Sequence, residues 1–300
     1  MIPKAKALKL IAIYLYICKL YDEELKYLSQ RYSNNDKPQF TDQEIMTIYL
    51  FSVQQEQRFR IIQMYDFADQ YLRSWFPALP SYQAFCNRLN RLNEAFKIVS
   101  ARMLVDFSPI DQNASFSVLD SMPVITCSGK RNGKVAPEIT DKGYCSTKSM
   151  YYYGLKLHAL AFSRPKQLPF PEHMVVTPAS ENDLNVFRQD WAAITNRTFF
   201  GDKIYNDTGF FKELTTNNNS VMLTPIKGVK NQPDSIKQQD KAANDLFSTA
   251  VSTIRQPIEA LFNWLIEKTD IQKASKVRST KGLLVHVFGK IAAAFIYLIF

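Results

Sequence analysis

Hydrophobic positions repeat at helical spacing through the first third of the chain. The apolar run Leu10–Cys18 continues at intervals of three and four into Leu28, which predicts an amphipathic helix. Thr41 and Glu44 have the spacing of a capping box, in which a hydroxyl and a carboxylate close the first turn of a helix. After Ser81, another apolar stripe is formed by Phe85, Leu89, Leu92, Phe96, Val99 and Met103. Residues 1–107 are therefore predicted to be almost wholly helical.

The pattern leaves the role of these helices open. Basic side chains such as Arg88 and Arg91 lie off the apolar stripe, as they would in a helix-turn-helix DNA reader. A plain helical bundle that supports the next domain, or a dimer, has the same pattern.

From residue 116 the apolar runs become short and alternate with polar positions. Five runs have the character of strands: Phe116–Cys127, Tyr151–Phe162, His173–Thr177, Thr198–Gly201 and Val221–Ile226. Glu181–Ile194 and Asn206–Leu214 have helical composition, and a long helix is expected to start near Gln256. The order is three strands, helix, strand, helix, strand and long helix, which predicts a mixed α/β domain.

Two polar segments are predicted to be loops. Ser128–Met150 connects the first two predicted strands and has a basic tip punctuated by glycine. Gly228–Lys241 is rich in glutamine and lysine and is expected to be mobile.

The charge of the chain changes the picture by suggesting a partner. The formal net charge is +9, from 37 basic and 28 acidic residues, and residues 271–300 carry five Lys or Arg without any Asp or Glu. A surface of this kind suits a polyanion, either nucleic acid or an acidic membrane face. The alternative is an ordinary solvated surface.

Cysteine spacing and apolar runs bear on the cellular compartment. The four cysteines form no C-x-x-C pair, so neither a disulfide framework nor a zinc site is expected, and reduced thiols suit the cytoplasm. Leu283–Phe300 contains His286 and Lys290, which favours a core helix over a membrane span. Leu10–Cys18 follows three lysines but lacks a cleavage site, so it is interpreted as a buried helix. No membrane partner is expected.

Three carboxylates stand at the ends of elements or on packed faces. Asp120 and Asp202 each follow a short apolar run, Glu259 lies on an amphipathic helix, and the spacings are 82 and 57 residues. Carboxylates from separate elements can hold two Mg²⁺ ions about 3.5–4 Å apart for phosphoryl transfer. Taken singly, each acid has the plainer interpretation of a surface group or helix cap, and spacing alone does not decide between them.

The sequence around these acids resembles a known family. Residues 115–300 resemble the catalytic domain of bacterial insertion-sequence transposases of the DDE type, which have a ribonuclease H-like fold. The matching segments are Leu119–Pro123, Phe200–Tyr205, Arg255–Phe262 and Lys276–His286. The resemblance implies an α/β fold, with a ribonuclease H-like mixed five-stranded sheet and flanking helices, preceded by an all-helical domain. The expected domains are 1–110, for DNA-end binding or dimerisation, and 111–300, for catalysis.

The resemblance also implies roles for individual residues. Asp120, Asp202 and Glu259 would be the catalytic and metal-binding triad for two Mg²⁺ ions, for which Mn²⁺ can substitute. The implied partner is double-stranded DNA, both the terminal inverted repeats and the target, and the active form would be a homodimer. Arg255 either orients a carboxylate, holds a phosphate, or only pairs with Glu259 at i,i+4.

Basic residues near these motifs are candidates for phosphate contacts, which give affinity rather than sequence choice. They are Lys130, Arg131, Lys134, Lys203, Arg255, Lys268, Lys276 and Arg278. Four other residues are interpreted as structural rather than functional: His158, Trp191, Tyr205 and Trp264. Two rival functions remain, a metal-dependent nuclease on the same fold and a catalytically silent DNA-binding descendant of a transposase.

Overall fold

The chain forms two compact units. The computed structural model describes residues 2–29, 38–108, 115–130, 132–164, 166–226 and 233–299. The helical unit comprises Met1–Phe107, Lys134–Glu138 and Leu265–Phe300, and the sheet unit comprises Ser108–Gly133 and Ile139–Trp264. The expected division at residue 110 stays a prediction. In the structure the N-terminal segment of the helical unit ends at Phe107, and Leu265–Phe300 groups with the same unit.

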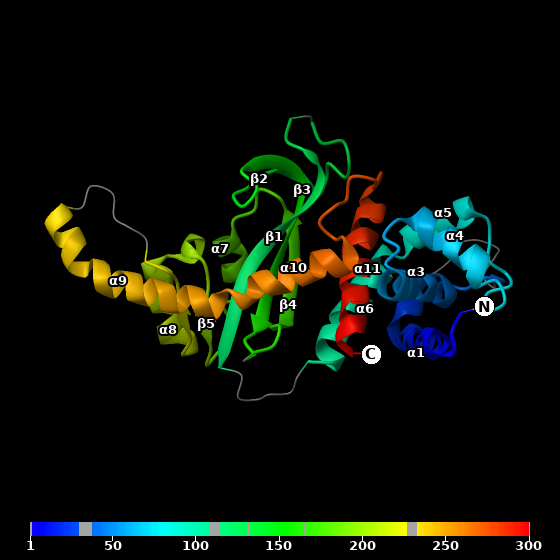
Figure 1. The fold of residues 1–300 in the computed structure, drawn as a ribbon, viewed down its shortest axis with the longest axis horizontal. Coiled ribbons are helices and arrows are strands. Elements are labelled where there is room, and N and C mark those ends of the chain that lie inside the picture. The colour runs from blue at the N-terminus through cyan, green and yellow to red at the C-terminus, as the bar shows by residue number, and fades with distance from the viewer. Residues whose placement is uncertain are drawn as a thin grey trace. The chain divides into compact units, whose positions relative to one another are not determined.

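The helical unit is built from the N-terminal helices and the C-terminal helix (Figure 1). Its helices are α1 (Lys4–Leu20), a π-helical turn (Tyr21–Leu25), α2 (Lys26–Leu28), α3 (Asp42–Glu56), α4 (Ile61–Tyr71), α5 (Tyr82–Arg91), α6 (Asn93–Asp106), the end of α10 (Pro257–Thr269) and α11 (Thr280–Ile299). The prediction of an almost wholly helical N-terminal region is confirmed.

The start of α3 forms as its sequence predicts. The backbone N–H of Thr41 donates to Glu44 Oε2 at 2.6 Å, and the N–H of Glu44 donates to Thr41 Oγ1 at 3.3 Å. The apolar stripe after Ser81 is buried along its whole length, but it spans two helices rather than one. The helical hydrogen-bonding pattern tightens at Leu92, whose N–H donates to the Leu89 carbonyl, and α6 then begins at Asn93.

Helix α11 lies in the core of the helical unit, packed on α6 and α3. A Cβ at Gly289 would lie 2.6 Å from the ring of Tyr49, so the absence of a side chain there allows the close approach of α11 to α3. Within the described residues, α11 is the one helix long and apolar enough to cross a membrane, but most of it is buried inside the unit. Its packing matches the predicted core helix.

Within the part of the chain that the structure describes, the sheet unit contains six strands, one more than the predicted five. They are β1 (Phe116–Ser128), β2 (Asp141–Cys145), β3 (Met150–Phe162), β4 (Phe170–Pro178), β5 (Thr198–Phe200) and β6 (Val221–Leu223). The additional strand, β2, lies inside the segment predicted to be a loop, Ser128–Met150. It is a short edge strand with only Gly143 and Cys145 buried, so its sequence lacks the apolar alternation that marks a strand.

The strand order is that of a ribonuclease H-like fold. β1 pairs antiparallel with β3 and parallel with β5, which pairs parallel with β6. β4 and β2 pair antiparallel with successive parts of β3. The partner of β3 changes from β2 to β4 around Gly154. At this residue a Cβ would lie 2.0 Å from the carbonyl oxygen of Val124, and φ is +158°. Only glycine fits this crossing without displacing β1.

Helices flank the sheet (Figure 1). They are α7 (Asp183–Val186) with a π-helical turn (Phe187–Trp191), a short 3₁₀ turn (Lys203–Tyr205), α8 (Thr208–Asn218) and α9 (Asp234–Arg255). One core cluster joins the four strands β1, β3, β5 and β6 to α7, the π-helical turn and α8. Its members include Leu119, Leu160, Val186, Phe187, Trp191, Phe199, Leu214 and Met222.

Helix α9 corrects a second loop prediction. Most of Gly228–Lys241 that the structure describes is the start of α9, and residues 227–232 lie outside the described residues. The helix is largely exposed, with Val251 its buried apolar side chain. Its first half is rich in lysine, glutamine and alanine, which favour helices without leaving an apolar stripe in the sequence. The helix predicted to start near Gln256 is α10, which begins at Pro257.

Candidate active site

Asp120 lies on β1, just beyond the point where the pairing of β1 with β5 ends. The pairing of β1 with β5 ends at Val118, two residues before Asp120, while on the other side Asp120 is opposite Ala159 of β3. The run that precedes it, Ser117–Leu119, is fully buried. The apolar residues that anchor β1 in the core therefore deliver a carboxylate to a position where one neighbouring strand has stopped.

Arg255 joins two of the predicted triad residues. Its Nη1 donates to Asp120 Oδ2 at 2.7 Å, and its Nη2 donates to Glu259 Oε1 at 2.6 Å. Arg255 is the last residue of α9, and Glu259 lies in the first turn of α10. Arg255 is thus more than the i,i+4 partner of Glu259, since it also reaches an acid 135 residues away.

Asp202 follows β5 and caps the short turn after it. Its Oδ1 accepts the N–H of Lys203 at 2.6 Å, and its side chain is exposed. Its negative charge raises the pKa of Asp120 and also the pKa of Arg255. Asp202 therefore interacts electrostatically with both, although no direct hydrogen bond joins them.

Burial raises the pKa of Asp120 to about 6. The charges of Asp183 and Asp202 act in the same direction, while Arg255 and the N–H of Ser121, 2.8 Å from Oδ1, act in the opposite one. The carboxyl is consequently poised between its protonated and ionised forms near neutral pH, as carboxyl groups at reaction centres often are.

Asp183 is a carboxylate that the sequence reasoning missed. It is buried at the start of α7, with Oδ1 3.1 Å from His158 Nδ1 and 3.4 Å from Lys156 Nζ. Burial raises its pKa, but His158 and Lys156 outweigh that effect and hold the pKa below its usual range. In the sequence Asp183 follows Asn182, which caps the helix, so it reads as an ordinary first-turn acid.

Two of the residues interpreted as structural, His158 and Tyr205, are fully buried. His158 is fully buried, and its Nε2 lies 2.8 Å from Thr177 Oγ1 while Nδ1 faces Asp183. Tyr205 is fully buried in the core cluster, with a hydroxyl that has no hydrogen-bond partner among the described residues. Burial, together with Asp183, Asp120 and Asp202, raises the pKa of Tyr205 far above its usual range.

The carboxylates around Arg255 have the right donor atoms for a metal ion, but they do not form a ready metal site. Among the described residues, no three His, Cys, Asp or Glu side chains lie close enough together to hold a metal ion. The donors near Arg255 are carboxylate oxygens, the ligands that Mg²⁺ prefers, so their chemistry suits the ion. In this arrangement, however, Arg255 balances the charge of Asp120 and Glu259, and a metal ion would have to displace it from at least one of them.

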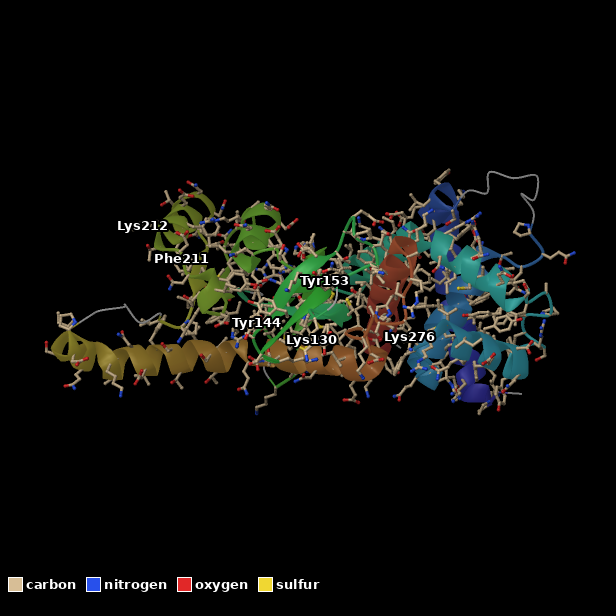
Figure 2. The ribbon with its side chains drawn as sticks, turned by 90° about the horizontal axis from the view of Figure 1, so that it is seen from above. Lys130, Tyr144, Tyr153, Phe211, Lys212 and Lys276 are labelled. Atoms are coloured by element: carbon tan, nitrogen blue, oxygen red, sulfur yellow. The ribbon has the colours of Figure 1, made fainter. Side chains whose placement is uncertain are left out.

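The predicted DNA contacts belong to both units. Lys130 extends from the turn after β1, and Lys276 lies on the segment before α11 (Figure 2). Lys134, Lys203, Lys276 and Arg278 are exposed, whereas Lys268 pairs with Glu267 at 2.8 Å. Arg131 lies outside the described residues.

Comparison with known families identifies the class of protein. A family model described as the transposase DDE domain matches residues 111–296, which is more than half of the chain. The protein therefore belongs to the DDE-domain transposases, whose general activity is phosphoryl transfer on nucleic acid, usually with divalent metal ions. No curated protein and no solved structure matches the chain significantly.

Proposed function

We propose that this protein is the DNA transposase of an insertion sequence. It cuts phosphodiester bonds at the element ends, the terminal inverted repeats, and joins the freed 3′-hydroxyls to target DNA. The observation that carries the proposal is the contact of one guanidinium, Arg255, with both Asp120 and Glu259, with Asp202 electrostatically coupled to the same group. Family membership supports the reaction class.

Each acidic residue has a proposed role. Asp120, Asp202 and Glu259 hold two Mg²⁺ ions, or Mn²⁺ in their place. When bound, such ions lower the pKa of water and neutralise charge on a reacting phosphate. Arg255 orients Asp120 and Glu259 in this structure, and it would be available to a DNA phosphate if bound ions took its place on these carboxylates. Because the reaction has two DNA ends, the active form is proposed to be a homodimer, acting in the cytoplasm.

One observation favours a second candidate, a catalytically silent DNA-binding protein. Arg255 neutralises two of the three carboxylates, and the described residues contain no ready three-ligand site. A nuclease on the same fold is distinguished only by its products, which would be cut ends without joining.

A strand-joining assay separates these candidates. The DNA carries the sequences that flank the gene, where the proposed inverted repeats would lie, labelled at the 5′ ends, together with a target plasmid and either Mg²⁺ or EDTA. We expect Mg²⁺-dependent joined products from the wild type. Asp120→Asn should remove cleavage and joining by more than about 100-fold while DNA binding stays within about twofold. Asp245→Asn, a change to an exposed acid of α9, is the matched control and should behave as wild type.

Three outcomes contradict the proposal in different ways. Cut ends without joined products would identify a nuclease. DNA binding without any cleavage in Mg²⁺ or Mn²⁺ would identify the silent protein. Unchanged cleavage by Asp120→Asn would remove the assignment of the site itself.

A further inference from the structure

The helical unit contains a cavity that lies outside the carboxylate site. Its volume is about 500 Å³, within the range of small-molecule pockets. It is lined by residues from α3, α4 and α5, from the segment 270–279, and from α11.

The walls of this cavity are aromatic and aliphatic. Phe59 and Tyr82 contribute rings, and Ile61, Ile62 and Val277 contribute branched side chains. Ile62 and Tyr82 are exposed, at 42% and 38%, so the wall continues to the surface. A flat aromatic ligand can stack on such walls, since aromatic side chains stack with bases of any sequence.

Polar groups with unused hydrogen-bonding capacity lie among these walls. Asn90 Oδ1 is buried and has no hydrogen-bond partner among the described residues. Lys290 is 1% exposed, lies 5.7 Å from the centre of the Phe59 ring, and donates to the carbonyl of Asp270 at 3.1 Å. Because an ammonium group has three donors, Lys290 can also donate to an acceptor on a ligand.

The mouth of the cavity is basic. Arg60, Lys273, Lys276 and Arg278 line it and are exposed. The acid in the lining, Asp270, pairs with Lys273 at 3.4 Å. Two guanidinium groups and Lys276 are therefore exposed lining groups without an opposing acid in the lining, which suits a phosphate group.

We propose that this cavity binds one unpaired nucleotide of the DNA substrate, with the base inside and its phosphate at the basic mouth. The aromatic walls stack on the base, Asn90 accepts a hydrogen bond from an exocyclic amine, and Lys276 and Arg278 contact the phosphate. A free mononucleotide has the same chemistry, and the test distinguishes the two sources. The inference rests on the proposed function for its choice of DNA.

The test compares two short duplexes that differ in one nucleotide. In one, 2-aminopurine is an unpaired bulge; in the other, it pairs with thymine. We expect the full-length wild type to bind the bulged duplex about 5- to 150-fold more tightly, with quenched 2-aminopurine fluorescence. Ile62→Trp, which fills the mouth, should bind both duplexes with the affinity of the paired one. Gln63→Trp, an exposed neighbour on α4 that does not line the cavity, should keep the preference.

Other variants and a competitor complete the design. Asn90→Leu should weaken the preference for the bulge, and Lys276→Gln should weaken binding of both duplexes. Equal affinity of the wild type for the two duplexes overturns the proposal. Tight binding of dAMP without any preference for the bulged duplex assigns the cavity to free nucleotides and also overturns it. Strand joining is measured separately, so equal affinities with intact joining refute only the nucleotide pocket, and a preference without joining refutes only the transposase proposal.

Discussion

At the scale of single residues, Arg255 determines the charge state of the candidate site. Its guanidinium lowers the pKa of Asp120, working against burial and the nearby charges of Asp183 and Asp202. Without Arg255, burial and the negative charges of Asp183 and Asp202 would still raise the pKa of Asp120, and the main opposing charge would be absent. The same cation makes the site stable in the absence of DNA and metal ions, because it partners two acids that would otherwise repel each other.

Arg255→Met should therefore raise the pKa of Asp120 above its present value of about 6. The titration midpoint of the Asp120 carboxyl carbon, followed by NMR on a ¹³C-labelled sample, measures the change. Arg188→Met is the matched control in the same unit, because Arg188 pairs with Asp207 at 2.6 Å and is not among the groups that shift the pKa of Asp120. A midpoint that stays in place, or falls, would contradict the role given to Arg255.

Lys290 makes stability depend on pH. Burial lowers its pKa from 10.5 to about 7, with Lys273 acting in the same direction and Asp270 against it. His286, which also faces Lys290, has its pKa lowered to about 3 by burial and is neutral in this range. Between pH 7 and 10.5 the unfolded chain binds more protons at Lys290 than the folded chain does, so this group's contribution to stability rises with pH across that window.

Lys290→Met should consequently be more stable than the wild type at pH 7, by about 1 kcal/mol or more. The difference in the free energy of unfolding between Lys290→Met and the wild type should narrow as the pH approaches 10. Lys290 is then increasingly neutral in the unfolded chain as well, so folding no longer requires removal of its proton. Urea unfolding at several pH values measures both effects. The control is Lys19→Met, whose side chain is 70% exposed and does not act on Lys290, so it should give a difference that varies little with pH. A difference that grows with pH would refute the explanation.

At the scale of elements, the crossing of β1 and β3 depends on one missing side chain. Gly154→Ala would place a Cβ 2.0 Å from the Val124 carbonyl, where the clash is with backbone and cannot be relieved by a rotamer change. We expect a loss of about 2 kcal/mol or more in the free energy of unfolding. Gly209→Ala in α8 meets only Asp207 Oδ1 at 3.4 Å and should be neutral or stabilising by up to about 1 kcal/mol. Equal effects of the two variants in denaturant unfolding would contradict this account.

The elements that could be predicted from the sequence are those with an apolar pattern or a capping motif in their own residues. Strands β1 and β3 have long buried apolar runs, with alternation in the second half of β1, and the capping box of Thr41 and Glu44 marks its own helix start. Strand β2 and the first half of α9 were missed because each is mostly exposed. β2 is held by its hydrogen bonds to β3, and the first half of α9 is polar. Neither segment therefore has an apolar periodicity that would predict it from the sequence.

The candidate site was predictable to a similar extent. Asp120, Asp202, Glu259 and Arg255 stand in recognisable local sequences, and Arg255 does contact Asp120 and Glu259 in the folded chain. Asp183 could not be found in that way, because its influence on Asp120 arises only when α7 packs beside β1 and β3. Long-range electrostatic contacts of this kind have no signature in local sequence.

At the scale of the whole molecule, the order of the chain does not define the compact units. Leu265–Phe300 follows Glu259, the last of the three candidate acids, in the sequence, yet α11 packs on α3 and α6. The family match continues to residue 296 and therefore includes residues from both units. An N-terminal truncation near residue 110 would remove the packing partners of α11 and expose its apolar surface, so catalytic experiments need the full chain.

The net charge of +9 predicts that the affinity of the protein for DNA depends on salt concentration. Affinity for duplex DNA should fall linearly with salt on a double-logarithmic plot, because bound cations are released from the DNA. Lys203→Gln, which removes an exposed charge beside Asp202, should reduce the magnitude of the slope by about 0.9 if Lys203 contacts one phosphate. Lys6→Gln is the control, since Lys6 pairs with Glu56 at 2.6 Å and should leave the slope unchanged. Fluorescence anisotropy at several salt concentrations measures both slopes, and equal slopes for Lys203→Gln and the wild type would exclude that contact.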